Sequence, residues 1–182
     1  MVKIISGILF SVLAIIVLLS CSQNPKVGNP DIDVKKAEAR IASVNAATSD
    51  TLKKIVKTKE EWKAQLTKEE YYVLREAGTE RSFTGDLWDN KKEGIYTCAG
   101  CDLPLFDSST KYKSGTGWPS FYQPINEVNL GRDTDQNLGY TRNEVHCARC
   151  GGHQGHVFND GPKPTGLRYC INSVSLNFVE QE

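Results

Sequence analysis

The feature that most constrains the fold of this chain is a pair of CxxC motifs, at Cys98–Cys101 and Cys147–Cys150. Each motif can form a tight turn that points two thiols in one direction, and four thiolates match the tetrahedral ligand set of zinc. The sequence therefore predicts a closed, structural zinc site with no open position for a substrate. Because 45 residues separate the motifs, the metal would cross-link two distant parts of one domain. The predicted ligands are Cys98, Cys101, Cys147 and Cys150.

Two other uses of these cysteines stay open at this point. In an oxidising compartment the four thiols can form disulfides, and a single CxxC can act as a thioredoxin-like redox pair. The duplicated spacing favours zinc over both.

The first twenty residues have the pattern of an export signal. Lys3 precedes an apolar run from Ile4 to Leu19, which is shorter than the roughly twenty residues that span a bilayer. Leu18-Leu19-Ser20-Cys21 resembles the lipobox of bacterial lipoproteins. We therefore expect a signal peptide over 1–20, a lipidated Cys21 and an extracytoplasmic location, on the periplasmic side or in the outer membrane. The alternatives are an ordinary signal peptide and an uncleaved anchor.

The rest of the chain divides into a tether over 21–57 and a folded domain over 58–182. The tether is poor in aromatic residues and contains SQNPKVGNPD, which favours extended and turn conformations. A short helix between residues 33 and 47 fits the spacing of its apolar residues, and we expect it to serve as a spacer. The chain has 22 basic and 22 acidic side chains, a balance that argues against nucleic-acid binding.

The folded domain begins with two helix-start signals and continues as short strands. Thr58 and Thr67 are each followed three residues later by Glu, which predicts two capped helices, the second ending at Gly78. Short apolar or aromatic runs then alternate with turns, as in antiparallel sheets. The last run alternates apolar and polar residues and predicts a terminal strand, with Cys170 just before it or at its start. These runs lie at 94–98, 103–106, 139–141, 156–158 and 173–179. The predicted fold class is mainly β (α+β).

Cys170 is the cysteine that remains once the zinc site and the lipid anchor are assigned. His153 and His156 precede it and can donate protons, and Asn172 follows it. Positive charge on Arg168 or on an imidazolium would favour the reactive thiolate. The structural alternatives are a buried, inert Cys170 and histidines that serve only as hydrogen-bonding groups or as a second metal site.

One loop is unusual in composition. Trp118 lies in the segment SGTGWPSF, between flexible glycines and Pro119. Such a tryptophan can wall an apolar ligand pocket, or it can cap the core.

The segment from about Lys59 to Phe178 resembles the methionine sulfoxide reductases of the B type, which act on the R epimer of methionine sulfoxide. The matching segments are CAGCDLPLF, SGTGWPSF, CARCGGHQGHVF followed by NDGP, and GLRYCINSVSL. The resemblance implies two antiparallel β-sheets with short N-terminal helices and one structural zinc ion held by four cysteines. Both expectations agree with the patterns above.

The resemblance also implies the roles of the site residues. It identifies Cys170 as the nucleophile that attacks the sulfoxide sulfur and becomes a sulfenic acid while a histidine protonates the departing oxygen. The catalytic set that it implies is Cys170, His153, His156 and Asn172. The substrate-binding set is Trp118, which contacts the methyl group of the sulfoxide, together with Phe158 and Arg168.

Some members of that family carry a resolving cysteine where this sequence has Thr116. We therefore expect an external thiol, such as a thioredoxin-like protein, to regenerate Cys170, and oxidised methionine in proteins or in free form to be the substrate of a monomeric enzyme. Two competing functions remain: a zinc-stabilised β module that binds a partner without redox activity, and a cysteine hydrolase that uses Cys170 with His156.

Overall fold

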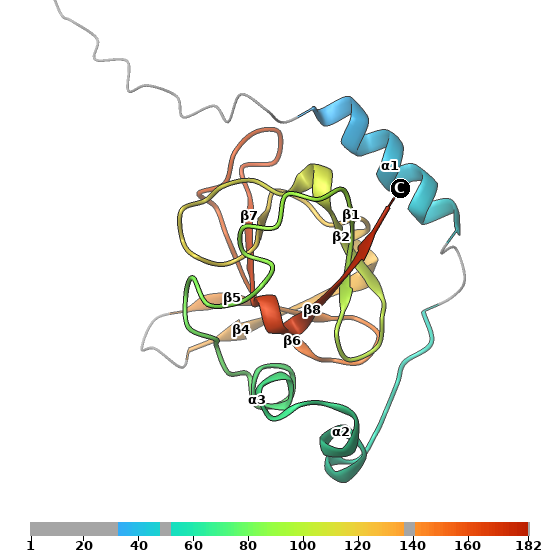
Figure 1. Ribbon diagram of the computed structural model, residues 1–182, viewed down its shortest axis with the longest axis vertical. Helices are drawn as coiled ribbons and strands as arrows, with labels where there is room; N and C mark the ends of the chain where they lie inside the picture. Colours follow the sequence, from blue (N-terminus) through green and yellow to red (C-terminus); the bar gives the residue numbers. More distant parts are fainter. Residues whose placement is uncertain (1–32, 48–51, 137–140, 182) are drawn as a thin grey trace, which may run out of the picture.

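The computed structural model describes residues 33–47, 52–136 and 141–181. The described residues contain three α-helices, which precede the strands in the sequence (Figure 1). The helices are α1 (Val34–Ala47), α2 (Lys59–Gln65) and α3 (Lys68–Glu76). The strands are β1 (Gly94–Cys98), β2 (Pro104–Asp107), β3 (Ser120–Phe121), β4 (Leu130–Asp135), β5 (Arg142–Cys147), β6 (His153–Phe158), β7 (Arg168–Ile171) and β8 (Leu176–Glu180). Short 3-10 helices lie at η1 (Ser108–Thr110), η2 (Glu127–Asn129) and η3 (Ser173–Ser175).

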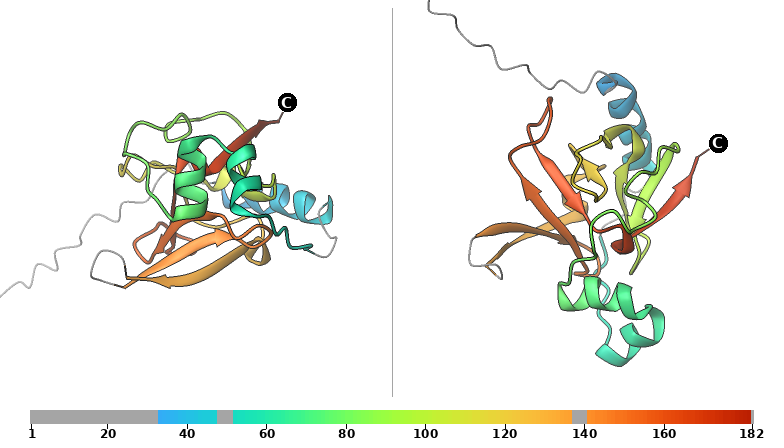
Figure 2. Two further views of the ribbon diagram at one scale, coloured as in Figure 1. Left: turned by 90° about the horizontal axis from the view of Figure 1, so that it is seen from below. Right: turned by 60° about the vertical axis from the view of Figure 1, so that its left-hand side comes forward.

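The strands form two antiparallel sheets, which confirms the predicted fold class. One sheet has three strands in the order β2-β1-β8, and the other has five in the order β3-β7-β6-β5-β4. The right-hand view of Figure 2 separates the two sheets, with the larger sheet on the left.

Aromatic side chains join the two sheets. Phe106 of β2 stacks on Phe121 of β3 with ring centroids 4.3 Å apart, and Tyr96 of β1 meets the edge of Phe121 at 5.0 Å. Tyr169 of β7 packs on Phe106 at 5.7 Å, and all four side chains are buried. Because alternate residues of a strand face opposite sides, anchoring Tyr169 in the core turns the neighbouring Cys170 to the other face of β7.

The two capped helices form where they are predicted. The hydroxyls of Thr58 and Thr67 each accept a hydrogen bond from the backbone N–H three residues later, and the carboxylate of the glutamate at that position accepts one from the threonine N–H. Trp62 of α2 is buried, and the guanidinium of Arg75 lies 4.8 Å from its ring and donates to the carbonyl of Cys150. These helices therefore cover the cysteine motifs.

Helix α3 ends differently from the prediction. The residue in the left-handed conformation is Ala77, with φ of 52°, and not Gly78. Gly78 has a different role: a Cβ atom there would lie 2.3 Å from the ring of Tyr72. The glycine therefore permits close packing and does not supply the cap.

Helix α1 matches the predicted short helix and packs on the domain beside β2 and η1 (Figure 1). Ala37 is fully buried. Arg40 donates to Asp107 at 3.1 Å and to Glu93 at 2.9 Å, and the side-chain amide of Asn45 donates to the carbonyl of Ile125 at 3.0 Å. This helix is therefore docked by a buried residue and by specific polar contacts.

The C-terminal strand prediction was partly wrong. Residues 173–179 do not form one strand, because η3 occupies Ser173–Ser175 and β8 begins at Leu176. The buried hydroxyl of Ser175 donates to the carbonyl of Asn172 at 2.8 Å, a contact that favours the turn. Cys170 lies on its own strand, β7, in the other sheet from β8.

Some predictions fall outside the described residues. These are the signal peptide at 1–20, Cys21, residues 22–32 and 48–51 of the predicted tether, and Gly139 and Tyr140 of the predicted run at 139–141. In the part of the chain that the structure describes, every helix is too short or too polar to cross a bilayer.

Candidate active site and metal centre

The four cysteines of the CxxC motifs converge at one point. Their sulfur atoms all lie within 4.8 Å of one another. Cys98 Sγ is 3.6 Å from Cys150 Sγ, and Cys101 Sγ is 3.5 Å from Cys147 Sγ. A disulfide needs about 2.05 Å, so this geometry does not support the disulfide alternative. Cys98 ends β1 and Cys147 ends β5, so the cluster connects the two sheets.

The cluster fits a tetrahedral metal ion. Four sulfur atoms at about 2.3 Å from a zinc ion would be separated by about 3.8 Å, close to the observed distances. Hydrogen bonds with Cys101 and the other thiols, together with burial, raise the pKa of Cys98. A bound cation would allow the thiols to release their protons.

Cys170 lies inside the five-stranded sheet with a strand on each side. Ser120 of β3 and His156 of β6 are its direct partners. Directly opposite residues of antiparallel strands point to the same face of the sheet. Arg168, two residues before Cys170, and Phe158, opposite Arg168, share this face because side chains alternate along a strand. The sheet thus brings four predicted site residues together: Cys170, His156, Phe158 and Arg168.

His153 contributes a buried imidazole to the site. Its ring centroid lies 5.4 Å from that of His156, and its Nδ1 is 2.6 Å from a carboxylate oxygen of Glu144. A carboxylate at Nδ1 places a proton on that nitrogen. Nε2 has no hydrogen-bond partner among the described residues, although His153 is only 4% exposed. Such a nitrogen is available to a substrate atom.

Thr116 contacts the thiol of Cys170. Its hydroxyl oxygen lies 3.8 Å from Cys170 Sγ. Ser114 Oγ lies 2.9 Å from the Thr116 hydroxyl and 2.7 Å from that of Ser120. The three hydroxyls therefore form a chain of contacts that ends at the sulfur of Cys170. Burial raises the pKa of Cys170, while the hydrogen bond from Thr116 and the charge of Arg168 oppose that rise.

Arg168 is held by two neighbours. It donates two hydrogen bonds to Asp160, each of 2.8 Å, and its guanidinium lies 4.4 Å from the ring centroid of Phe158. The hydrogen bond from Arg168 lowers the pKa of the Asp160 carboxyl. The paired guanidinium therefore has a fixed position near Cys170.

Asn172 is buried, and its side chain is committed to the protein backbone. Its amide nitrogen donates to the carbonyl of Gln154 at 3.0 Å, and its amide oxygen accepts from the N–H of Glu80 at 3.1 Å. The structure thus places Asn172 two residues beyond Cys170, where it ties the end of β7 to β6 and to Glu80.

The Trp118 loop is connected to Glu80. Trp118 Nε1 donates to the main-chain carbonyl of Glu80 at 3.3 Å. The carboxylate of Glu80 accepts from the backbone N–H groups of Ser173 at 2.6 Å and Val174 at 2.9 Å. Burial raises the pKa of Glu80. Trp118 is only partly buried, so it is available at the surface of the site.

The sequence analysis missed three carboxylates and one hydroxyl contact. Glu144 is separated by one residue from His146 in an alternating segment, and Asp160 is the second residue after β6, so both carried weak signals. Glu80 is a single acid in Gly78-Thr79-Glu80 and carries no signal of its partners. The contact of Thr116 with Cys170 joins residues 54 positions apart, which no local pattern reveals.

Comparison with known proteins identifies the family. The model of the SelR domain matches residues 66–180. A peptide methionine sulfoxide reductase MsrB of Leptospira interrogans is 55% identical over 125 residues, which cover 69% of this chain and 95% of that protein. The protein of the same name from Methanosarcina mazei is 57% identical over 71% of this chain and 92% of its own length. The protein of that name from Pseudomonas putida is 58% identical over 72% of this chain and 98% of its own length.

The matched range contains the four clustered cysteines and every residue described around Cys170. The chain therefore belongs to the SelR-domain family, that of the B-type peptide methionine sulfoxide reductases.

Proposed function

We propose that this protein reduces the R epimer of methionine sulfoxide, in oxidised proteins and as the free amino acid, with Cys170 as the nucleophile. Family membership supports sulfoxide reduction. The observation that carries the assignment of residues is the position of Cys170, which is partly exposed, opposite His156 on the neighbouring strand and in contact with Thr116 of the Trp118 loop.

The reaction is a two-electron exchange between two sulfur atoms. The Cys170 thiolate attacks the sulfoxide sulfur, and the S–O bond breaks as that oxygen is protonated and leaves. Addition of water to the cysteine sulfur and cleavage of the S–S bond then give methionine and Cys170 sulfenic acid. The sum is thiol plus sulfoxide giving sulfenic acid plus thioether, in which cysteine is oxidised and methionine sulfoxide reduced.

His153 is our candidate for the proton donor. Its Nε2 is buried and has no partner among the described residues, and Glu144 lies at its other nitrogen. Protonated, His153 presents an N–H to the substrate oxygen while Glu144 stabilises the imidazolium. His156, directly opposite Cys170, orients the thiol and the substrate, and Asn172 positions the end of β7 through Gln154 and Glu80.

Stereoselectivity requires separate positions for the methyl group and the oxygen. We assign the methyl group to Trp118 and the oxygen to His153, with Phe158 and Arg168 completing the substrate contacts. The S epimer would place its oxygen on the indole and its methyl group against a polar nitrogen. Leaving that nitrogen without a partner is unfavourable.

Regeneration requires two electrons from outside the chain. Thr116 lies next to Cys170 and cannot form a disulfide, and four of the other cysteines are clustered with one another. We propose that two external thiols, supplied by a thioredoxin-like protein, reduce the sulfenic acid to thiol and water and become a disulfide.

We further propose that the cysteine cluster holds one zinc ion with a structural role. Cys98, Cys101, Cys147 and Cys150 would all be ligands, which leaves no open position. The ion would cross-link β1 and β5, beneath α2 and α3.

The location of the enzyme is proposed from the N-terminal sequence. The signal pattern of residues 1–20 and the lipobox-like sequence before Cys21 support export and lipid anchoring, on the periplasmic side or in the outer membrane. Intact-mass analysis of the membrane-extracted protein tests this proposal. Loss of residues 1–20 with acyl groups on Cys21 is expected, and an unmodified N-terminus would contradict it.

The central test is turnover of purified protein with dithiothreitol and the separate R and S epimers of N-acetyl-methionine sulfoxide. We expect reduction of the R epimer only, abolished in Cys170→Ser and retained when the exposed Ser43 of α1 is changed to Ala. Full activity of Cys170→Ser, equal use of both epimers, or cleavage of an ester substrate would contradict the proposal.

A further inference from the structure

A cavity of about 530 Å³ lies beside the Trp118 loop. Its walls come from residues in 83–92, which join α3 to β1, from residues in 108–113, and from the loop at 114–118. This volume is in the range of natural ligand sites. Trp118 lines the cavity, and Thr116 of the same loop touches Cys170. The cavity and the site around Cys170 therefore share one loop.

An exposed aromatic residue in a strained conformation forms part of the wall. Phe83 is 55% exposed and has φ of 65°, a backbone conformation that is unfavourable for a bulky residue. Its N–H donates to the carbonyl of Gly117 at 2.8 Å, and its ring meets that of Trp88 edge-on at 5.3 Å. Gly117 is essential here, since a Cβ atom would lie 2.7 Å from the Phe83 ring.

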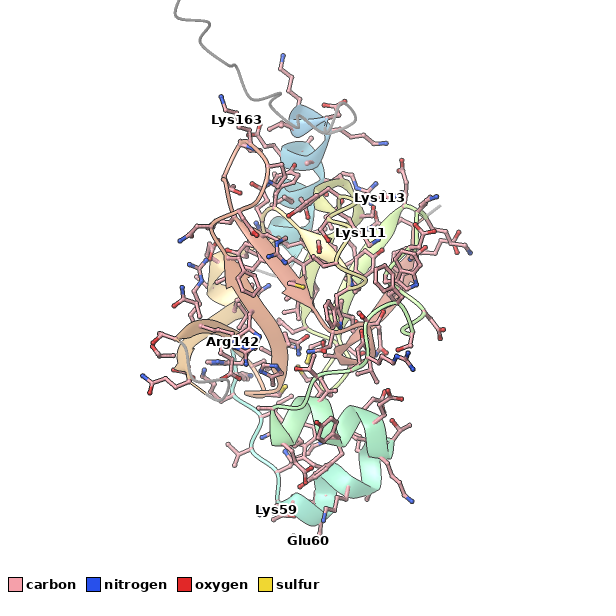
Figure 3. All side chains as sticks on the ribbon, turned by 90° about the vertical axis from the view of Figure 1, so that its left-hand side faces the viewer. Lys59, Glu60, Lys111, Lys113, Arg142 and Lys163 are labelled. Atoms are coloured by element: carbon pink, nitrogen blue, oxygen red, sulfur yellow. The ribbon has the colours of Figure 1, made fainter. Side chains whose placement is uncertain are left out.

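The cavity is rich in positive charge. Four lysines line it (Lys91, Lys92, Lys111 and Lys113), against one carboxylate, Asp89. Asp89 lies 3.8 Å from Lys91, and Lys92 pairs with Glu180 at 2.7 Å. Lys111 and Lys113 have no carboxylate within ion-pair distance among the described residues. Figure 3 shows these two lysines well away from Lys59 and Glu60 at the start of α2.

Lys111 has a fixed position. Its ammonium group donates to the carbonyl of Trp88 at 2.9 Å and to that of Asn90 at 3.0 Å. Burial lowers the pKa of Lys111 to about 8, an effect that Asp89 opposes and Lys91 reinforces, and the group still carries its charge at neutral pH. A cation that faces only carbonyl dipoles can gain from an anionic partner.

We propose that this cavity is a secondary substrate site, which binds the polypeptide flanking the oxidised methionine and selects an aspartate or glutamate side chain there. The proposal rests on the proposed sulfoxide reductase function and specifies its substrate class. An extended chain advances about 3.3–3.6 Å per residue, so residues within a few positions of the sulfoxide reach the cavity from Trp118. The aromatic walls would contact the chain, and Lys111 and Lys113 would meet the carboxylate.

The test uses full-length protein and a host peptide, acetyl-Ala-Ala-Met(R-sulfoxide)-Ala-Ala-amide. Glu, Gln or Lys replaces one alanine at a time, and kcat/KM is measured with dithiothreitol beside N-acetyl-methionine R-sulfoxide. Binding of the same peptides to Cys170→Ser protein is measured by calorimetry. At one position or more, we expect kcat/KM and binding affinity to decrease from the Glu to the Gln to the Lys peptide. Successive peptides should differ by about two- to five-fold, and the differences should be smaller at high salt.

Charge reversal gives the matched comparison. Lys113→Glu should invert the order of the Glu and Lys peptides, and Lys59→Glu, at the exposed start of α2, should leave the order unchanged. Two outcomes would overturn the cavity assignment and leave the reductase function standing, provided that N-acetyl-methionine R-sulfoxide is reduced. Either the Glu, Gln and Lys peptides have the same kcat/KM, or Lys113→Glu and Lys59→Glu change the order of the peptides equally. If the small substrate is not reduced at all, the proposed function fails, and the calorimetric order alone decides whether the cavity selects acidic peptides.

Discussion

Trp118 Nε1 and the main-chain carbonyl of Glu80 form a hydrogen bond of 3.3 Å, which ties the loop next to Cys170 to the segment after α3. The carboxylate of the same glutamate accepts the N–H groups of Ser173 and Val174. Glu80 thus joins the proposed methyl-binding tryptophan to the turn that follows β7.

Glu80→Gln should destabilise the fold. The amide keeps the shape but replaces one acceptor oxygen with a donor, which leaves the N–H of Ser173 or Val174 without its partner. A buried unsatisfied donor costs about 1–3 kcal/mol, so the free energy of unfolding in urea should fall by that amount. Asp86→Asn, a neighbouring exposed site, should change it by less than about 0.5 kcal/mol. Equal effects of the two changes would show that the contacts of Glu80 do not stabilise the fold.

The local parts of the fold were predictable from the sequence, and the non-local parts were not. The capping boxes at Thr58 and Thr67 involve residues three positions apart, and the structure contains both. Strand β3 has only two residues, and β4 is too polar for an apolar pattern. These strands depend on pairing with distant partners, such as Ser120 with Cys170. The turn at Ser173 overrides the alternation that predicts a strand, because its polar side chains are buried against Gln154 and Asn172.

The candidate site shows the same division. The CxxC spacing located the cysteine cluster, because a tetrahedral site needs only its ligands in two turns. The residues that hold the site in place, Glu80, Glu144 and Asp160, come from separate segments and have their partners only in the folded chain. A resemblance of motifs can indicate the reacting residues, but it does not reveal the hydrogen bonds that orient them.

Thr116→Val should make Cys170 less reactive at neutral pH. Burial raises the pKa of this thiol and the Thr116 hydroxyl opposes that effect, so removing the hydroxyl should raise the pKa further. A hydrogen bond has a net worth of about 0.5–1.5 kcal/mol, so its loss should raise the pKa of Cys170 by a measurable amount. The pH dependence of iodoacetamide labelling of the Cys170 peptide measures it, with the exposed Thr84→Val as control. An unchanged or lower midpoint would contradict the role of the hydroxyl.

Thr116→Cys should convert the regeneration pathway. Side chains 116 and 170 are already in contact, so a thiol at position 116 can attack the sulfenic acid and release water. After one turnover without reductant, peptide mapping should find a disulfide between positions 116 and 170 in this variant and no intramolecular disulfide of Cys170 in the wild type. A disulfide from Cys170 to a clustered cysteine in the wild type would contradict the proposed external regeneration.

Loss of one cysteine of the cluster should remove the metal and unfold the protein. A structural zinc site contributes about 10–16 kcal/mol of binding free energy, comparable to or above the total stability of an ordinary domain. We expect about one zinc ion per chain by elemental analysis in the wild type and in Cys170→Ser. Cys150→Ser should lose both the metal and the cooperative thermal transition. A folded, metal-free Cys150→Ser protein would show that the cluster does not need an ion.

Arg40→Ala should release α1 from the domain. Asp107 has a fully buried side chain, and its partner Arg40 is 17% exposed, so the substitution leaves a buried carboxylate without its cation. Breaking a buried pair costs about 3–5 kcal/mol, and we expect the lower end because Arg40 keeps some contact with water. Hydrogen exchange of residues 34–47 measures the lost free energy if the helix undocks alone. Urea unfolding measures it if the helix unfolds together with the domain. Lys36→Ala is the control, since its pair with Glu93 is exposed on both sides and should contribute little to stability. If Arg40→Ala and Lys36→Ala behave alike, the Asp107 pair does not hold the helix, and α1 would be a spacer.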